Sequence, residues 1–115
     1  MAYERDRRGR YVTRPVKHPG KDDLLWLAGL LEGEGCFFEH HHRYPAIALS
    51  MTDEDVVEYV AKLMNTTYYM IKSVNGNKPV FRCAISGTNA VTFMKWIRPY
   101  MHIRRGKRID ELVGK

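Results

Sequence analysis

A helix-forming segment that is interrupted by glycine constrains the fold of this chain more than any other part of its sequence. Residues 24–35 read LLWLAGLLEGEG, and their leucines and tryptophan are typical of a buried helix. Glycine in a helix interior costs roughly 1 kcal/mol relative to alanine. The segment nevertheless holds Gly29, Gly33 and Gly35, so we expect a contact here that a side chain would prevent.

Gly29 and Gly33 are four residues apart and therefore share one face of the predicted helix, with Ala28 beside them. Small residues on a helix face allow the backbone of another helix to approach closely. The sequence offers no second helix of matching shape, whereas an identical helix from another copy would match it about a twofold axis. We therefore predict a homodimer with Ala28, Gly29 and Gly33 at its interface.

Glu32 and Glu34 place two carboxylates at the C-terminal end of the same helix. An anion at that end opposes the helix dipole and needs compensation. In a twofold dimer these carboxylates would occur in symmetric pairs with cations between them. Hard oxygen ligands of this kind suit Mg²⁺. Two such ions on either side of a phosphate stabilise both the attacking and the leaving oxygen of phosphodiester hydrolysis.

Positive charge is concentrated near the two ends of the chain. The net charge is +6; residues 1–21 and 98–108 each carry a net +5, whereas residues 22–97 carry −3. This distribution favours a polyanionic partner, most simply nucleic acid, although residues 1–21 could instead be a solvated tail. Because 1–21 lacks periodicity and contains two prolines, we predict a basic flexible N-terminal arm there and one folded domain over 22–115.

The pattern of apolar residues along this domain predicts an α+β fold with the order αββαββα and a short final helix. The expected helices lie at about 24–34, 53–64, 88–98 and 101–114, and the expected strands at 36–44, 46–51, 66–73 and 79–86. A twisted antiparallel four-stranded sheet would bury one face under the helices. Its other face would stay open to a partner.

Several classes of protein are excluded by composition. No apolar run is long enough to span a bilayer, and the N-terminus has no apolar signal-peptide core. We therefore expect a soluble intracellular protein with no membrane partner and no small-molecule substrate. Cys36 and Cys83 are too few for a disulfide framework and lack the CxxC spacing of a zinc site.

The nonamer LAGLLEGEG, with Trp26 before it and the strand start GCFF at its end, resembles the signature of the LAGLIDADG homing endonucleases. The resemblance extends over residues 22–110 in the order of the elements. It implies a nuclease of a mobile genetic element that cuts both strands of a long, roughly palindromic DNA site. The implied cofactor is Mg²⁺, with Mn²⁺ able to substitute. It further implies a saddle of two sheets along the major groove and, for a chain with a single motif, a homodimer.

The resemblance also assigns roles to residues of the motif. It places the metal ligand at the scissile phosphate on Glu34, with the backbone carbonyl of Gly33 as a further ligand. Glu32 takes a structural part and is a less favoured metal ligand.

A basic residue after the third helix is the next implied part of the catalytic site. It falls on Arg104, with Arg105 and Lys107 as neighbours, and its implied role is to polarise the attacking water or to stabilise the phosphate charge. The family often has Gln or Lys at the end of the second strand, where this chain has LSMT at 49–52. This departure keeps two alternatives open: a DNA-binding regulator that has lost cleavage, and an intron RNA-splicing cofactor.

The alternation of side chains along strands predicts which residues face DNA. The expected base or phosphate contacts share the open face of the sheet: Phe38, His40, His42, Ser50, Tyr68, Met70, Lys72 and Arg82. A metal ion shared by His40 and His42 is a less favoured alternative, since alternate residues of a strand lie on one face.

Overall fold

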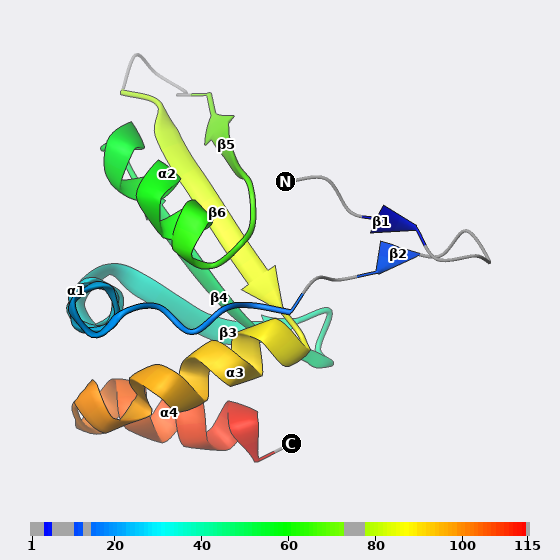
Figure 1. The fold of residues 1–115 in the computed structure, drawn as a ribbon, viewed down its shortest axis with the longest axis vertical. Helices are drawn as coiled ribbons and strands as arrows, with labels where there is room; N and C mark the ends of the chain where they lie inside the picture. Colours follow the sequence, from blue (N-terminus) through cyan, green and yellow to red (C-terminus); the bar gives the residue numbers. More distant parts are fainter. Residues whose placement is uncertain (1–3, 6–10, 13–14, 73–77, 115) are drawn as a thin grey trace.

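The computed structural model describes residues 4–5, 11–12, 15–72 and 78–114 of the chain. Over these ranges the predicted α+β fold is confirmed, with four α-helices and a four-stranded antiparallel sheet (Figure 1). The elements are β1 (Glu4–Arg5), β2 (Tyr11–Val12), α1 (Lys21–Glu34), β3 (Gly35–His40), β4 (Tyr44–Met51), α2 (Glu54–Leu63), β5 (Tyr68–Ile71), β6 (Val80–Ser86), α3 (Thr88–Ile97), the 3₁₀ turn η1 (Arg98–Tyr100) and α4 (Ile103–Val113). None of the described helices is long and apolar enough to cross a membrane.

The sheet has the strand order β3-β4-β6-β5, and each neighbouring pair is antiparallel. Phe37 of β3 lies opposite Ile47 of β4, and Leu49 of β4 lies opposite Cys83 of β6. All four side chains are buried, so they mark the face of the sheet that carries the core. The strands β3 and β5 form the two edges.

The helices bury their apolar faces against this side of the sheet. In α1 the buried positions Leu24, Leu27 and Leu31 recur at helical spacing. All four helices contribute side chains to one core cluster together with the inward residues of the strands. Figure 1 shows α2 lying along β6 and α3 lying beside α4.

Helix α1 passes into β3 without a connecting loop. Glu34 is the last helical residue and Gly35 is the first residue of the strand. The N–H of Gly35 donates to the carbonyl of Leu31, and a Cβ atom at position 35 would lie only 2.7 Å from that oxygen. The junction therefore requires glycine at this position, which accounts for the last of the three glycines in the motif.

The first strand ends earlier than the sequence predicts. β3 stops at His40, and residues 41–43 form a turn before β4 begins at Tyr44. His41 and His42 have φ angles of 53° and 55°, which belong to the left-handed region and interrupt an extended strand.

Residues 15–20, which fall within the predicted arm, lie against the domain. Val16 packs on the core, and the ring of His18 lies 4.5 Å from that of Trp96. Further towards the N-terminus β1 pairs with β2 in antiparallel fashion. Residues 1–3, 6–10 and 13–14 lie outside the described residues, so the flexibility of the arm stays a prediction.

Candidate functional site

Glu34 stands exposed at the end of α1, where the helix joins the edge strand β3. The last carbonyl groups of a helix lack partners within the helix, and here the Glu32 carbonyl accepts a hydrogen bond from Arg105 Nε at 3.1 Å. The predicted ligands, the Glu34 carboxylate and the Gly33 carbonyl, belong to this same last turn. The end of α1 is thus a source of hard oxygen donors, which are the ligands that Mg²⁺ prefers.

One copy of the chain does not complete a metal site among its described residues. They contain no group of three His, Cys, Asp or Glu side chains that could hold a metal ion. Mg²⁺ commonly keeps several waters and takes one or two carboxylates together with substrate phosphates. Glu34 therefore fits as a carboxylate ligand where a phosphate, or the carboxylate of a second copy, completes the set.

Glu32 points into a different environment from Glu34. Residues two apart on a helix do not face each other. The Oε1 atom of Glu32 accepts a hydrogen bond from the backbone N–H of His102 at 2.9 Å, and its Oε2 atom is buried without a hydrogen-bond partner among the described residues. These contacts favour the structural part that the resemblance implies, and they argue against Glu32 as a metal ligand beside Glu34.

The basic residues of α4 divide into two groups. Arg105 and Arg108 are half-buried, and each donates from Nε to a backbone carbonyl. Arg105 donates to the carbonyl of Glu32 at 3.1 Å, and Arg108 donates to the carbonyl of Phe37 at 3.3 Å. Arg104 and Lys107 are exposed. Of the three predicted catalytic cations, Arg104 and Lys107 thus stay available to a phosphate, whereas Arg105 is engaged with the backbone of α1.

The sheet register places four of the predicted DNA contacts on the open face. Phe38 and His40 alternate with the inward Phe37 on β3, and Ser50 of β4 lies opposite Arg82 of β6. Arg82 Nη1 donates to the Ser50 hydroxyl at 3.1 Å. Phosphate and base contacts both require polar groups that reach out of such a face, and Arg82 is placed to supply them.

The other four predicted contacts lie elsewhere. His42 belongs to the turn after β3, so it does not share the face of His40, and the two do not form a strand pair for a metal ion. Tyr68 and Met70 lie opposite Cys83 and Phe81 on the helix side of the sheet.

Lys72 is exposed, but it follows the end of β5 at Ile71 and so lies outside the strand.

Tyr68 is held on the helix side because its hydroxyl donates to the carboxylates of Glu54, at 2.8 Å, and Glu58, at 2.9 Å. These hydrogen bonds hold the pKa of Tyr68 above its ordinary value, and the hydrogen bond to Glu54 has the larger effect.

The register brings three further side chains to the open face that the sequence reasoning missed. They are Tyr44 at the start of β4 and Tyr69 and Ile71 on β5, with relative exposures of 42%, 54% and 43%. Their exposure is the signal, because large apolar or aromatic side chains left open on one face mark an interaction surface. Aromatic rings also supply stacking and apolar contacts to bases.

Four residues form an exposed stripe along α1: Leu25, Trp26, Gly29 and Gly33. A Cβ atom built on either glycine would meet no atom within 4 Å, so there is open space above both glycines. The predicted interface residue Ala28 is only 1% exposed and belongs to the core. Its placement at a dimer interface is therefore wrong, because its side chain packs in the core and is not part of the exposed stripe.

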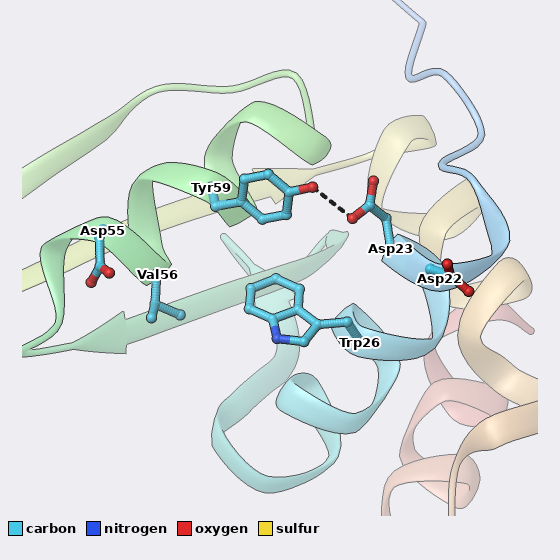
Figure 2. Close-up of a pocket in the computed structure, with 6 residues that line it drawn as sticks. All are labelled: Asp22, Asp23, Trp26, Asp55, Val56 and Tyr59. Atoms are coloured by element: carbon cyan, nitrogen blue, oxygen red, sulfur yellow. Dashed lines mark hydrogen bonds between the residues drawn. The ribbon is translucent and has the colours of Figure 1, made fainter.

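A hollow of about 540 Å³ lies between the N-terminal end of α1 and α2. Figure 2 shows its lining, which is Asp22, Asp23, Trp26, Asp55, Val56 and Tyr59. The Tyr59 hydroxyl donates to Asp23 at 2.6 Å, which raises the pKa of Tyr59. Three carboxylates disfavour any phosphate here, so this end of α1 is chemically unlike the Glu34 end.

Comparison with known proteins supports the fold. No family model and no curated protein matches the sequence. The homing endonuclease I-CvuI in complex with its target Sro1.3 in 2 mM Ca matches with a TM-score of 0.59 and 15% identity, over 80% of this chain and 64% of that one. I-CvuI with the I-CreI target C1221 in 2 mM Mg, in which the DNA is not cleaved, matches with a TM-score of 0.59 and 14% identity, over 82% and 65%.

An archaeal intron-encoded homing endonuclease, I-Vdi141I, complexed with DNA, matches with a TM-score of 0.57 and 10% identity, over 81% of this chain and 67% of that one. At these identities the likeness is one of fold, and it confirms the homing-endonuclease fold that the resemblance implies. The chain spans about two thirds of the length of these structures.

Proposed function

We propose that the chain is a homodimeric, site-specific DNA endonuclease that makes metal-dependent double-strand cuts. One observation carries the proposal: the exposed stripe of α1 runs to Glu34 at the α1–β3 junction, where the open face of the sheet begins. A second copy packed on this stripe about a twofold axis would set two Glu34 carboxylates near each other and two open sheet faces side by side.

In this proposal each part of the site has a distinct task. Glu34, with the Gly33 carbonyl, would hold a divalent cation at the scissile phosphate. The bound Mg²⁺, or Mn²⁺ in its place, supplies Lewis-acid stabilisation of the charge that develops on the phosphate. Arg104 and Lys107 neutralise the phosphate from the exposed face of α4, and Arg104 acts as a charge rather than as a base because guanidinium keeps its proton.

The open face of the sheet binds DNA in the same proposal. Arg82 and His40 would contact base edges or phosphates, and Tyr44 and Tyr69 would contribute apolar and stacking contacts. Predominantly phosphate contacts would set the register of the protein on the duplex, and the side chains of the sheet would select its sequence.

Cleavage of a library of long duplexes by the purified protein tests this proposal. We expect cutting of both strands in Mg²⁺ and none after chelation of the metal with EDTA. Glu34→Gln should keep the dimer and DNA binding and should lower the cleavage rate by orders of magnitude, because the metal loses its anionic ligand. Asp55→Asn is the matched control: it removes an exposed carboxylate that lines the hollow at the other end of α1, away from the Glu34 junction.

A DNA-binding regulator without cleavage is the second candidate. It is favoured by the end of β4, where the family often has Gln or Lys and this chain has Ser50, whose hydroxyl already accepts a hydrogen bond from Arg82. Tight DNA binding with no cutting in either Mg²⁺ or Mn²⁺ would reject the nuclease and support the regulator. If Glu34→Gln cut DNA at the wild-type rate, Glu34 would not be the metal ligand of the site.

A further inference from the structure

Helix α4 holds the α1–β3 junction at two places, one on each side of Glu34. On the α1 side, Arg105 donates to the Glu32 carbonyl at 3.1 Å and the His102 N–H donates to the Glu32 carboxylate at 2.9 Å. On the β3 side, Arg108 donates to the Phe37 carbonyl at 3.3 Å. The backbone that carries Glu34 is therefore fixed from residues 32 and 37 by a helix that lies some seventy residues later in the chain.

These contacts satisfy groups that the local structure leaves unpaired. The Glu32 carbonyl lies in the last turn of α1, where carbonyls lack intrahelical partners. The Phe37 carbonyl belongs to β3, an edge strand of the sheet. The His102 N–H precedes the first turn of α4, and it is matched by a carboxylate whose negative charge suits a helix N-terminus.

The guanidinium of Arg105 is held in this position by a second contact. Its Cζ lies 5.9 Å from the centroid of the Phe37 ring, within the range of a cation–π interaction. Arg105 thus touches residues on both sides of Glu34. Its neighbour Arg104 is exposed, so two consecutive arginines of one helix face different surroundings.

We propose that Arg105 and Glu32 are positioning residues, which fix the backbone at Glu34 through α4 and do not themselves touch the phosphate. We call these contacts from α4 to Glu32 and Phe37 the clamp. The clamp is a property of the fold, and the inference rests on the proposed function only for the importance of Glu34. It assigns Arg105 a different role from that of Arg104, although the resemblance groups the two as neighbouring cations of the catalytic site.

Local hydrogen exchange tests the clamp without any use of catalysis. In Arg105→Ala the amides of Glu34 and Gly35 should exchange about tenfold faster or more, as expected when a hydrogen bond from a charged group is deleted. Arg105→Lys, which keeps a cationic donor, should restore part of the protection. In Arg104→Ala these amides should exchange at the wild-type rate.

A backbone variant tests the Glu32 contact separately. His102→Pro removes only the N–H donor from the backbone, and the local geometry suits proline, since His102 has a φ of −83° and the preceding Met101 is extended at φ −88° and ψ 145°. His102→Ala is the matched control, because it keeps the N–H. Exchange at residues 34 and 35 should rise in His102→Pro and stay unchanged in His102→Ala.

Cleavage measurements then separate positioning from catalysis. Arg105→Ala and His102→Pro should slow single-turnover cutting while the DNA dissociation constant stays within about twofold of wild type, and Arg105→Lys should recover part of the rate. Unchanged exchange at residues 34 and 35 in both variants would overturn the clamp. Faster exchange in a protein whose wild type never cuts DNA would uphold the clamp and reject the nuclease.

Discussion

Alanine at Gly29 and Gly33 should change the stability of the monomer and that of the dimer in opposite directions. Both glycines lie in α1, both are exposed, and an added Cβ would meet no atom within 4 Å in the single chain. Replacement of glycine by alanine in a helix interior removes backbone freedom from the unfolded chain and stabilises the helix by about 0.5–1 kcal/mol. The monomer of the double variant should therefore gain about 1–2 kcal/mol.

The same methyl groups would occupy the space that the proposed partner helix needs. A twofold axis doubles each substitution, so four methyl groups enter one interface. Overpacking of this kind typically costs about 1–3 kcal/mol. Because 1.4 kcal/mol is a factor of ten in a binding constant, we expect the dimer dissociation constant to rise about tenfold or more.

Two measurements on one pair of proteins check these opposite signs. Sedimentation velocity over a concentration series gives the dimer dissociation constant. Urea unfolding at concentrations below that constant gives the free energy of unfolding of the monomer, which avoids the concentration dependence that a dimer would impose. A substitution that acted only by general disruption of α1 would raise the dimer dissociation constant and lower the free energy of unfolding of the monomer, so a stabilised monomer distinguishes the two explanations.

A double variant that dimerises as tightly as wild type would refute the packing of α1 against α1. The glycines would then need a different explanation, since the single chain leaves the space above them empty. Gly33→Leu extends the test with a larger side chain, and it should separate the copies at micromolar concentration if the stripe is the interface.

Three further predictions concern the junction, the thiols and the pH dependence of stability. Gly35→Ala should lower the free energy of unfolding by about 1–3 kcal/mol, measured by urea unfolding, because its Cβ would lie 2.7 Å from the Leu31 carbonyl oxygen; an unchanged midpoint would contradict the tight junction. In the native protein a thiol reagent should modify Cys36 quickly and Cys83 hardly at all, since Cys36 is exposed on the open face and Cys83 is buried; a bound DNA target should protect Cys36, and equal rates with and without DNA would argue against this face as the DNA surface. Burial raises the pKa of the Cys83 thiol from 9.0 to about 11. The contribution of the neutral thiol to stability is therefore complete below pH 9 and is lost as the pH rises towards 11, at up to about 1.4 kcal/mol per pH unit. Cys83→Ala should flatten the plot of the free energy of unfolding against pH in that window relative to wild type.

The strands that could be predicted from sequence are those whose residues alternate in size. In β4 the large Ile47 and Leu49 alternate with the small Ala46 and Ala48, and the structure points the large pair into the core. The sequence of β5, YYMI, has no such alternation. Tyr68 lies on the helix side of the sheet because its hydroxyl donates to two carboxylates of α2. A contact between separate elements cannot be read from the sequence of the strand alone.

Helix α4 shows the reverse case, in which a usable signal was present. Positions 105, 108, 109 and 112 follow the spacing of one helix face, and Ile109 and Leu112 on that face are buried. The half-buried Arg105 and Arg108 flank the same face, whereas Arg104 and Lys107 lie away from it. Periodicity alone therefore separates the engaged from the exposed cations, although it does not reveal that their acceptors are the carbonyls of Glu32 and Phe37.

The two ends of α1 carry opposite chemistry, and this asymmetry bears on how the protein would approach DNA. At its N-terminal end Asp22 and Asp23 line the hollow shared with α2, together with a third carboxylate. At its C-terminal end Glu34 lies next to the junction that α4 holds, and α4 exposes Arg104 and Lys107. A polyanion near the protein is repelled from the three carboxylates of the hollow and attracted to the exposed cations of α4, and the basic residues before and at the start of α1, among them the exposed Lys17 and Lys21, attract it as well. Long-range charge would therefore turn the basic surfaces of the domain towards the phosphates before any side chain of the sheet meets a base, and the order of events would be orientation first and sequence selection second.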